Sequence, residues 1–335
     1  MNRHLLLVGD PGPVAELVRA QRDALVTVTA LCRTADIPRF AGLRHVNRIL
    51  ATGPQDESCE AWTSTAVLAH RVSAMTHAAV LDPHFFSRAA HVADVLGIDL
   101  YPRSNFRAIH DHWALRQRLR AAGDDVGATL VPDRGALLSS VAEHGLPCLL
   151  RSRQLDRPAA VLRSLEMVEQ AADGAIEGIA PGPGILVEPA GDSSRLCVAV
   201  LAEGGRSVVL AMLRQRGDRE WVAVQQTSQG DPEPDDEAVR SAPAYAVALT
   251  ETLGVLDGLL LLDLGTAAAG QLTVNAARLG LPSRAVCQAV LRASGVDVAV
   301  YCARQCAGQP ALDPALEAAR AFAETARPPS CRSRN

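Results

Sequence analysis

The chain has 335 residues, of which 48% are hydrophobic, and its formal net charge is -4. This length is enough for two or three domains, and the near-neutral charge gives no electrostatic footprint for DNA or RNA, so we expect no nucleic-acid partner. No stretch approaches the roughly 20 apolar residues that span a bilayer. The apolar start of the chain is also too short for a signal peptide. We therefore expect a cytoplasmic protein that handles small molecules and does not bind a membrane.

The 33 residues counted as Lys or Arg are all arginines. The chain therefore has no lysine to form a Schiff base, to bind phosphate or to act as a general base. Its 8 cysteines are scattered, and only Cys302 and Cys306 lie close together, without the second ligand pair that a zinc site needs. This pattern favours reduced thiols in a cytosolic protein.

The first hundred residues alternate between short apolar runs and amphipathic segments. The pattern predicts strands at 4–8, 26–31, 46–50 and 77–81, and helices from Pro13, over 60–74 and over 85–96. Such alternation predicts a parallel sheet with helices on both faces. The loop from Gly9 to Pro13 lacks the third glycine of a dinucleotide-binding loop, and its two prolines remove N–H donors, so a tight turn is favoured there.

Beyond this unit the pattern changes to hairpins and longer helices. Asp111 is placed to cap a helix over 111–122, and Gly204–Gly205 to join a hairpin. The remaining predictions are strands at 145–151, 185–188, 259–263 and 272–275, hairpin strands at 196–202 and 208–213, helices over 158–172, 238–253 and 283–295, an acidic loop at 229–237 and a disordered tail after 326. The fold class is therefore α/β followed by α+β, with a Rossmann-like N-terminal domain.

Five segments, in this order, resemble landmarks of the carboxylate–amine (L-amino-acid) ligase branch of the ATP-grasp superfamily. They are the helical segment 105–123, the strand 145–151, the hinge strand 186–189, and the two strands 258–263 and 272–280, which resemble the metal-bearing pair. The resemblance implies a Rossmann-like domain over 1–103, a two-lobed ATP-grasp domain with lobes 104–185 and 186–326, and a tail over 327–335.

The resemblance also implies a reaction. In the family, ATP with Mg²⁺ converts a carboxylate to an acyl phosphate, and an amine attacks it to give an amide or peptide bond. The implied cofactors are ATP and Mg²⁺, and the implied substrates are a small-molecule carboxylate and an amine, in specialised metabolism. A homodimer or a partner enzyme is the assembly that we expect.

Six residues carry this expectation. The resemblance places His112, Arg151 and Glu188 at the nucleotide, Asp263 and Asn275 at the metal, and Arg278 at a phosphate or substrate carboxylate as the catalytic cation. We expect Arg151, Glu188, Asp263, Asn275 and Arg278 to line one cleft, because each lies at or just beyond a strand end.

The sequence departs from the family pattern at the phosphate and metal positions. His112 and Arg151 stand where lysines are usual, Thr273 stands where a second metal carboxylate is usual, and the loop 152–158 contains no glycine. These losses favour an alternative, a catalytically inactive pseudo-enzyme that serves as a binding or partner subunit. Other readings also stay open: Arg151 as an ion-pair partner of Glu188, His112 as an exposed helix residue, and Asp263 as a surface strand end.

Overall fold

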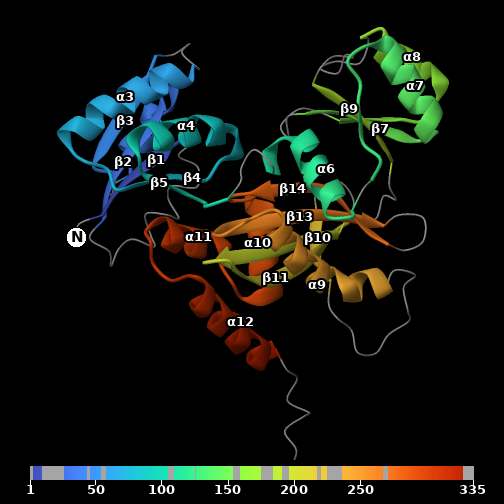
Figure 1. Ribbon diagram of the computed structural model, residues 1–335. Helices are drawn as coiled ribbons and strands as arrows, with labels where there is room; N and C mark the ends of the chain where they lie inside the picture. Colours follow the sequence, from blue (N-terminus) through green and yellow to red (C-terminus); the bar gives the residue numbers. More distant parts are fainter. Residues whose placement is uncertain are drawn as a thin grey trace, which may run out of the picture.

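The computed structural model describes residues 3–9, 26–43, 46–53, 58–104, 109–124, 126–153, 159–174, 184–190, 196–216, 220–224, 236–266 and 271–326. These residues form three β-sheets, whose strands lie within residues 3–101, 129–189 and 196–279. In Figure 1 the first two sheets, with their helices, stand side by side above the third. The expected helix from Pro13 and the tail after 326 lie outside the described residues. So does most of the expected acidic loop.

The N-terminal sheet is parallel, as the alternating pattern predicts. Its strands are ordered β3-β2-β1-β4-β5. The elements are β1 (Arg3–Val8), β2 (Val26–Arg33), a 3₁₀ turn (Thr34–Asp36), α2 (Ile37–Ala41), β3 (Arg48–Thr52), α3 (Cys59–Val72), β4 (His77–Val80), a 3₁₀ turn (Pro83–Phe85), α4 (Phe86–Leu96) and β5 (Asp99–Tyr101). One face of this sheet packs on α3 and α4 through residues such as Leu6 and Trp62.

The second sheet is antiparallel, with the order β6-β9-β7-β8. Its elements are β6 (Thr129–Leu130), α7 (Arg134–His144), β7 (Cys148–Ser152), β8 (Ala159–Leu162), α8 (Leu165–Ala172) and β9 (Ile185–Pro189). The single helix predicted over 158–172 is wrong in its first half, because Ala159–Leu162 pairs with β7 and the helix begins only after Ser164, whose side chain caps it.

The third sheet is also antiparallel and has the order β12-β11-β10-β13-β14. Its elements are β10 (Leu196–Glu203), β11 (Arg206–Arg216), β12 (Glu220–Ala223), α9 (Asp236–Thr252), β13 (Gly258–Thr266) and β14 (Leu272–Leu279), followed by α10 (Arg284–Ser294), α11 (Val298–Cys306) and α12 (Leu312–Ala326). The predicted hairpin is confirmed, with Gly204 and Gly205 at its turn.

Both faces of this third sheet are covered. Residues such as Leu259 and Leu261 pack against α10, α11 and α12, in one core with Leu5 and Leu7 of the N-terminal sheet. The opposite face, which includes Leu260, packs against α9 and against α6 (His112–Ala121). The N-terminal sheet and the third sheet therefore share a continuous hydrophobic core.

Helix α6 occupies a place that the sequence does not predict. The expected domain division puts it in the first lobe, but Leu115 and Leu119 are fully buried in the core that includes Leu260 of the third sheet. In Figure 1 the helix lies between β14 and the lobe that carries β7 and β9. It therefore brings residues 112–121 to the boundary between the two lobes.

Among the described residues, no single helix is long and apolar enough to cross a membrane, although α10 and α11, bent by 105° at their junction, pass together on length and composition.

Candidate functional site

Three elements bring charged side chains to the boundary between the second and third sheets. Helix α6 begins at Asp111, whose carboxylate accepts hydrogen bonds from the backbone N–H groups of Trp113 and Ala114. Strand β7 carries Arg151 one residue before its end at this boundary, and β9 places Glu188 beside it, since the two strands are paired. Three of the predicted residues therefore lie together with the start of α6.

Glu188 is held by two arginines. Nε and Nη2 of Arg116 donate to Oε1 and Oε2 of Glu188 at 2.7 and 2.9 Å, and Nε of Arg151 lies 3.3 Å from Oε2. The side chains of Arg116, Arg151 and Glu188 are only 3%, 10% and 3% exposed. The alternative in which Arg151 pairs with Glu188 is therefore the observed arrangement.

Burial alone would raise the pKa of the Glu188 carboxyl. The charge of Arg116, its hydrogen bonds and the charge of Arg151 outweigh burial, so the pKa is lowered and the group is ionised at neutral pH. Arg116 was missed by the sequence analysis. The signal was present, because position 116 follows His112 by one helical turn and so faces the same side of α6.

The same arginines reach the edge of the third sheet. Arg116 donates to the backbone carbonyls of Val274 and, at 3.2 Å, Asn275, and Arg151 donates to the Asn275 carbonyl at 2.9 Å. Both carbonyls belong to β14, which ends the sheet. The cluster of Arg116, Arg151 and Glu188 therefore joins the two lobes.

His112 is buried, not exposed as one reading of the sequence expected. It is 5% exposed, and its backbone N–H donates to the Arg153 carbonyl at 2.8 Å. Burial, followed by the charge of Arg151, lowers the pKa of its imidazole to about 3. Within the described part of the chain, Nδ1 has no hydrogen-bond partner. At neutral pH, His112 is therefore a neutral hydrogen-bonding group and not a second cation.

The metal positions lie on β13 and β14. The register between these strands breaks between Asp263 and Leu264, where Asp263 pairs with Ala276 and Leu264 with Val274, so Asn275 is an extra, bulged residue. A Cβ added to Gly265 would lie 2.7 Å from Nδ2 of Asn275, which shows that the amide packs over this glycine. Asp263 and Gly265 alternate on one face of β13, so the Asn275 amide lies on the face of Asp263.

Arg278 joins the same neighbourhood. Its side chain is exposed, whereas Asp263 is half-buried. Burial, reinforced by the negative charge of Asp263 and opposed by Arg278, raises the pKa of the Cys197 thiol to about 12. Arg278 also lowers the pKa of His112 through its charge. Charge interactions thus link Arg278 to His112 and also to the neighbourhood of Cys197 and Asp263. Arg151 and Glu188 lie one residue before the ends of β7 and β9, as expected. Asp263 and Asn275 lie inside β13 and β14, so the expectation that each site residue stands at a strand end is wrong for these two.

These residues fit one Mg²⁺ and do not fit two. Mg²⁺ in nucleotide sites is held by one or two carboxylates together with phosphate oxygens and water. Asp263 and the Asn275 amide supply two such oxygens, but Thr273 supplies a hydroxyl in place of the second carboxylate. In the described ranges, no group of three or more His, Cys, Asp or Glu side chains is placed to hold a metal ion. A second metal would therefore lack ligands.

Most of the loop that follows Arg151 lies outside the described residues, including Arg157. Arg153, at its start, donates to the Asp111 carboxylate at 2.6 Å and remains 44% exposed. It thus ties β7 to the start of α6. A surface ion pair of this kind contributes little stability, about 0–1 kcal/mol.

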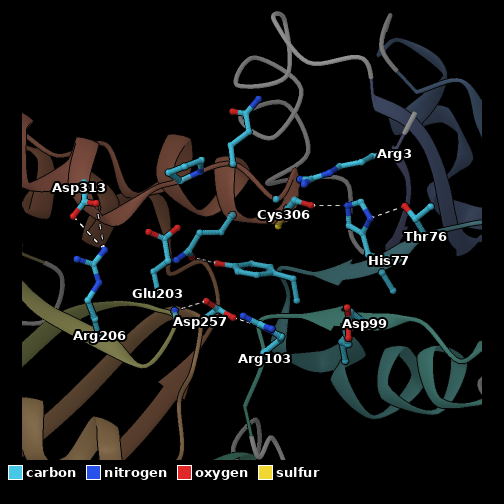
Figure 2. Close-up of a pocket in the computed structure, with 18 residues that line it drawn as sticks. Arg3, Thr76, His77, Asp99, Arg103, Glu203, Arg206, Asp257, Cys306 and Asp313 are labelled. Atoms are coloured by element: carbon cyan, nitrogen blue, oxygen red, sulfur yellow. Dashed lines mark hydrogen bonds and ion pairs between the residues drawn. The ribbon is translucent and has the colours of Figure 1, made fainter. Parts of the chain in front are cut away.

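A pocket of about 1040 Å³ lies elsewhere, at the first residues of β1, β4 and β5 (Figure 2). None of the six predicted residues lines it. Its polar groups join parts of the chain: Nε2 of His77 bonds the Cys306 carbonyl at 2.9 Å, and Arg103 pairs with Asp257. Because open α/β sheets bind ligands at the opposite, carboxyl edge of their strands, we assign this pocket to a joint between domains.

Solved structures match this architecture, whereas no family model and no curated protein matches the sequence. The L-amino acid ligase from Bacillus licheniformis gives a TM-score of 0.72 at 15% identity, over 93% of this chain and 76% of that chain. The N5-carboxyaminoimidazole ribonucleotide synthetase from Thermotoga maritima gives 0.67 at 16% identity, over 92% and 77%. The biotin carboxylase from Campylobacter jejuni gives 0.66 at 14% identity, over 91% and 71%. At such identities the likeness shows the fold alone.

Proposed function

We propose that this chain, whose fold is that of ATP-grasp enzymes, binds ATP between its lobes and joins a small-molecule carboxylate to an amine, with one Mg²⁺. The observation that carries the proposal is the convergence of Asp263, Asn275 and Arg278 on the part of β13–β14 that adjoins Arg151. A hard-cation ligand pair beside two arginines suits a ligand that carries both phosphate and a divalent ion.

Each residue has a defined role in this proposal. Asp263 and Asn275 would hold Mg²⁺, and Arg151 would contact phosphate oxygens, with His112 as a neutral hydrogen-bonding neighbour. Arg278, the most exposed cation of the group, would bind the substrate carboxylate. Bound ATP would supply the phosphoryl group that activates this carboxylate. The Glu188 side chain would orient Arg116 and Arg151. The contacts with the nucleotide would then come from other groups of β9, the strand that carries Glu188.

The domain division is also a proposal. The strand order β3-β2-β1-β4-β5 supports the Rossmann-like description of residues 1–103. Since β9 is hydrogen-bonded within the second sheet and α6 packs on the third, we propose residues 126–190 as the body of the first lobe, in place of 104–185. The cytoplasmic location, the assembly and the role in specialised metabolism stay predictions.

A second candidate function is a non-catalytic ATP-grasp subunit that binds a ligand or partner. The neutral His112 favours it, as does the burial of Arg116 and Arg151 against Glu188, because both reduce the positive charge available to a triphosphate. The two candidates differ in turnover, since only the first releases ADP.

The experiment is ADP release in the presence of ATP, Mg²⁺ and a panel of amino acids. We expect release that depends on a carboxylate and an amine together, and that falls at least about tenfold in Arg278→Ala. The matched control is Arg206→Ala, because this arginine lies in the pocket of Figure 2 and pairs with Asp313 on the surface. Binding of ATP without any release of ADP would favour the non-catalytic subunit.

A further inference from the structure

We propose that Arg116, Arg151 and Glu188 form a latch that holds the two lobes together, with Glu188 as an internal counter-ion that a phosphate-bearing ligand displaces from Arg151. The joining of the lobes stands on the geometry alone. The displacement of Glu188 rests on the proposed function. We call these three residues the interlobe latch.

The latch acts on an open sheet edge. Strand β14 is the last strand of the third sheet and pairs only with β13 among the described strands. Backbone groups on such an edge need partners from elsewhere when they are buried. The carbonyls of Val274 and Asn275 find theirs in the two arginines, which are carried by α6 and β7.

The bulge at Asn275 makes this contact possible. In a regular strand, successive carbonyls point to opposite edges, so two in a row reach one partner only where the ladder is broken. The register breaks opposite these residues, and Arg116 accordingly bonds the carbonyls of both Val274 and Asn275. The latch therefore holds the same residue whose side chain is the candidate metal ligand.

The donors of Arg116 are almost fully used inside the protein. Nε and Nη2 bind the Glu188 carboxylate, and Nη1 and Nη2 bind carbonyls of β14. Arg151 is the more exposed of the two arginines, at 10% against 3%. A ligand anion at the boundary between the lobes would therefore meet Arg151 and compete with Glu188 for it, while Arg116 keeps its place.

Charge explains why Glu188 acts as the counter-ion. Two guanidinium groups buried side by side need an anion, and Glu188 supplies it, leaving a net charge of about +1 on the latch. The lowered pKa of Glu188 keeps the carboxylate ionised at neutral pH. A phosphate or carboxylate on a ligand would supply the same charge from outside, and would allow the lobes to rearrange.

The joining of the lobes is tested without any ligand, by hydrogen exchange of backbone amides. In Glu188→Gln the arginines lose their counter-ion, so we expect amides of β14 and β9 to exchange at least about tenfold faster. The control is Asp173→Asn, which removes an exposed ion pair with Arg134 inside the first lobe. Unchanged exchange of β14 and β9 in a folded Glu188→Gln protein would overturn the latch.

A second variant covers the case in which Glu188→Gln does not fold. Arg116→Met with Glu188→Met removes one charge of each sign, keeps the net charge of the latch, and replaces a buried pair by apolar groups of similar size, which proteins often tolerate. The same faster exchange of β14 and β9 is expected. Exchange at the wild-type rate in this folded double variant would contradict the latch.

The counter-ion role is tested by titrating the same proteins with pyrophosphate in the absence of Mg²⁺. We expect the double variant to bind pyrophosphate at least about tenfold more tightly than the wild type, because pyrophosphate no longer competes with Glu188 for Arg151. Equal or weaker binding, or no binding by either protein, would overturn this role. The proposed function is tested separately, by ADP release from the wild-type protein. The interlobe latch is tested by hydrogen exchange of backbone amides without ligand, so the two can fail independently.

Discussion

The identity of the residue at position 112 decides how much positive charge the candidate site holds. The sequence places a histidine where the family pattern has lysine, and the fold buries it beside Arg151 and Arg116. Both burial and these neighbours disfavour the imidazolium form. The site therefore relies on arginines, whose charge does not respond to burial in the same way.

This burial predicts a pH dependence of stability. The unfolded chain binds a proton at His112 below about pH 6.5, whereas the folded chain does not until about pH 3. The folded pKa is lowered, so the free energy of unfolding falls as pH drops below 6.5, by up to about 1.4 kcal/mol per pH unit from this residue. His112→Gln removes this contribution.

The measurement is denaturant unfolding at several pH values between 7 and 5. Because burial of His4 and partial burial of His77 also lower their pKa values, both proteins should lose stability in acid. We expect the free energy of unfolding of the wild type to fall more steeply with decreasing pH. The difference in slope corresponds to the uptake of up to one more proton on unfolding. Parallel curves for wild type and His112→Gln would contradict the burial of a neutral imidazole.

Gly265 gives a second prediction at the residue scale. Its backbone does not need glycine, but a methyl group there would meet the Asn275 amide at 2.7 Å and push it aside. We expect Gly265→Ala to fold and to reduce the effect of Mg²⁺ on nucleotide affinity by about tenfold. The control is Gly42→Ala, where an added Cβ meets nothing within 4 Å. An unchanged Mg²⁺ effect would remove Asn275 from the metal site.

At the scale of elements, sequence patterns predicted the strands with continuous apolar runs and failed where tertiary contacts decide. The runs at 4–8, 26–31 and 259–263 are strands in the structure. The segment 159–162 was expected to be helical, but it is a strand because β7 offers it a partner edge. Helix α7 was not foreseen, since its buried face comprises only three residues, Leu137, Ser140 and Val141.

The site was foreseen to a similar extent. Arg151 and Glu188 lie near the ends of β7 and β9, as the apolar runs predicted, whereas Asp263 and Asn275 lie inside β13 and β14, because pairing extends these strands beyond their apolar runs. Arg116 was missed, because its role depends on which sheet α6 packs against. The burial of His112 was missed for the same reason. The spacing of four residues places Arg116 on the same side of the helix as His112, but the sheet against which Leu115 and Leu119 pack is not specified by the helical pattern.

The docking of α12 on α10 gives a prediction at this scale. Helix α10 ends at Gly295 with φ +71°, where an added Cβ would lie 2.6 Å from Cβ of Phe322 on α12. Helix α4 ends at Gly97 with φ +63° and nothing within 4 Å. We expect both glycine-to-alanine changes to lower the free energy of unfolding by about 1 kcal/mol for the left-handed backbone, and Gly295→Ala by about 1–3 kcal/mol more for the clash.

Thermal or denaturant unfolding of the two variants checks this prediction, and the difference between them isolates the contact with Phe322. Equal losses of stability would mean that α12 does not pack closely on the end of α10. Phe322 lies near the C-terminal end of α12, far along the chain from the start of the helix at Leu312. The contact at Gly295 is therefore one of the places where this helix is held.

At the scale of the whole molecule, the parts built on the N-terminal sheet and on the third sheet share a core. The lobe built on the second sheet is joined to them through polar contacts. The N-terminal and third sheets are continuous through one hydrophobic cluster, and the hydrogen bonds around the pocket of Figure 2 reinforce this joint. Helix α6 lies on the third sheet and meets the first lobe through the interlobe latch. The candidate site lies at this polar boundary, where the arginines join the two lobes and, in the proposed function, Arg151 also contacts the ligand.

The central claim is that this boundary binds a nucleotide with one metal ion, and calorimetric titration with ATP tests it most directly. Loss of two charge-assisted contacts of about 1.5–3 kcal/mol each, relative to a site with the full set of lysines and carboxylates, predicts binding weaker by roughly two to four orders of magnitude. We expect measurable binding of ATP that Mg²⁺ strengthens in the wild type, that Mg²⁺ no longer strengthens in Asp263→Asn, and that is weakened in Arg151→Ala. Absence of binding by the folded wild-type protein, or binding that neither substitution changes, would contradict the account.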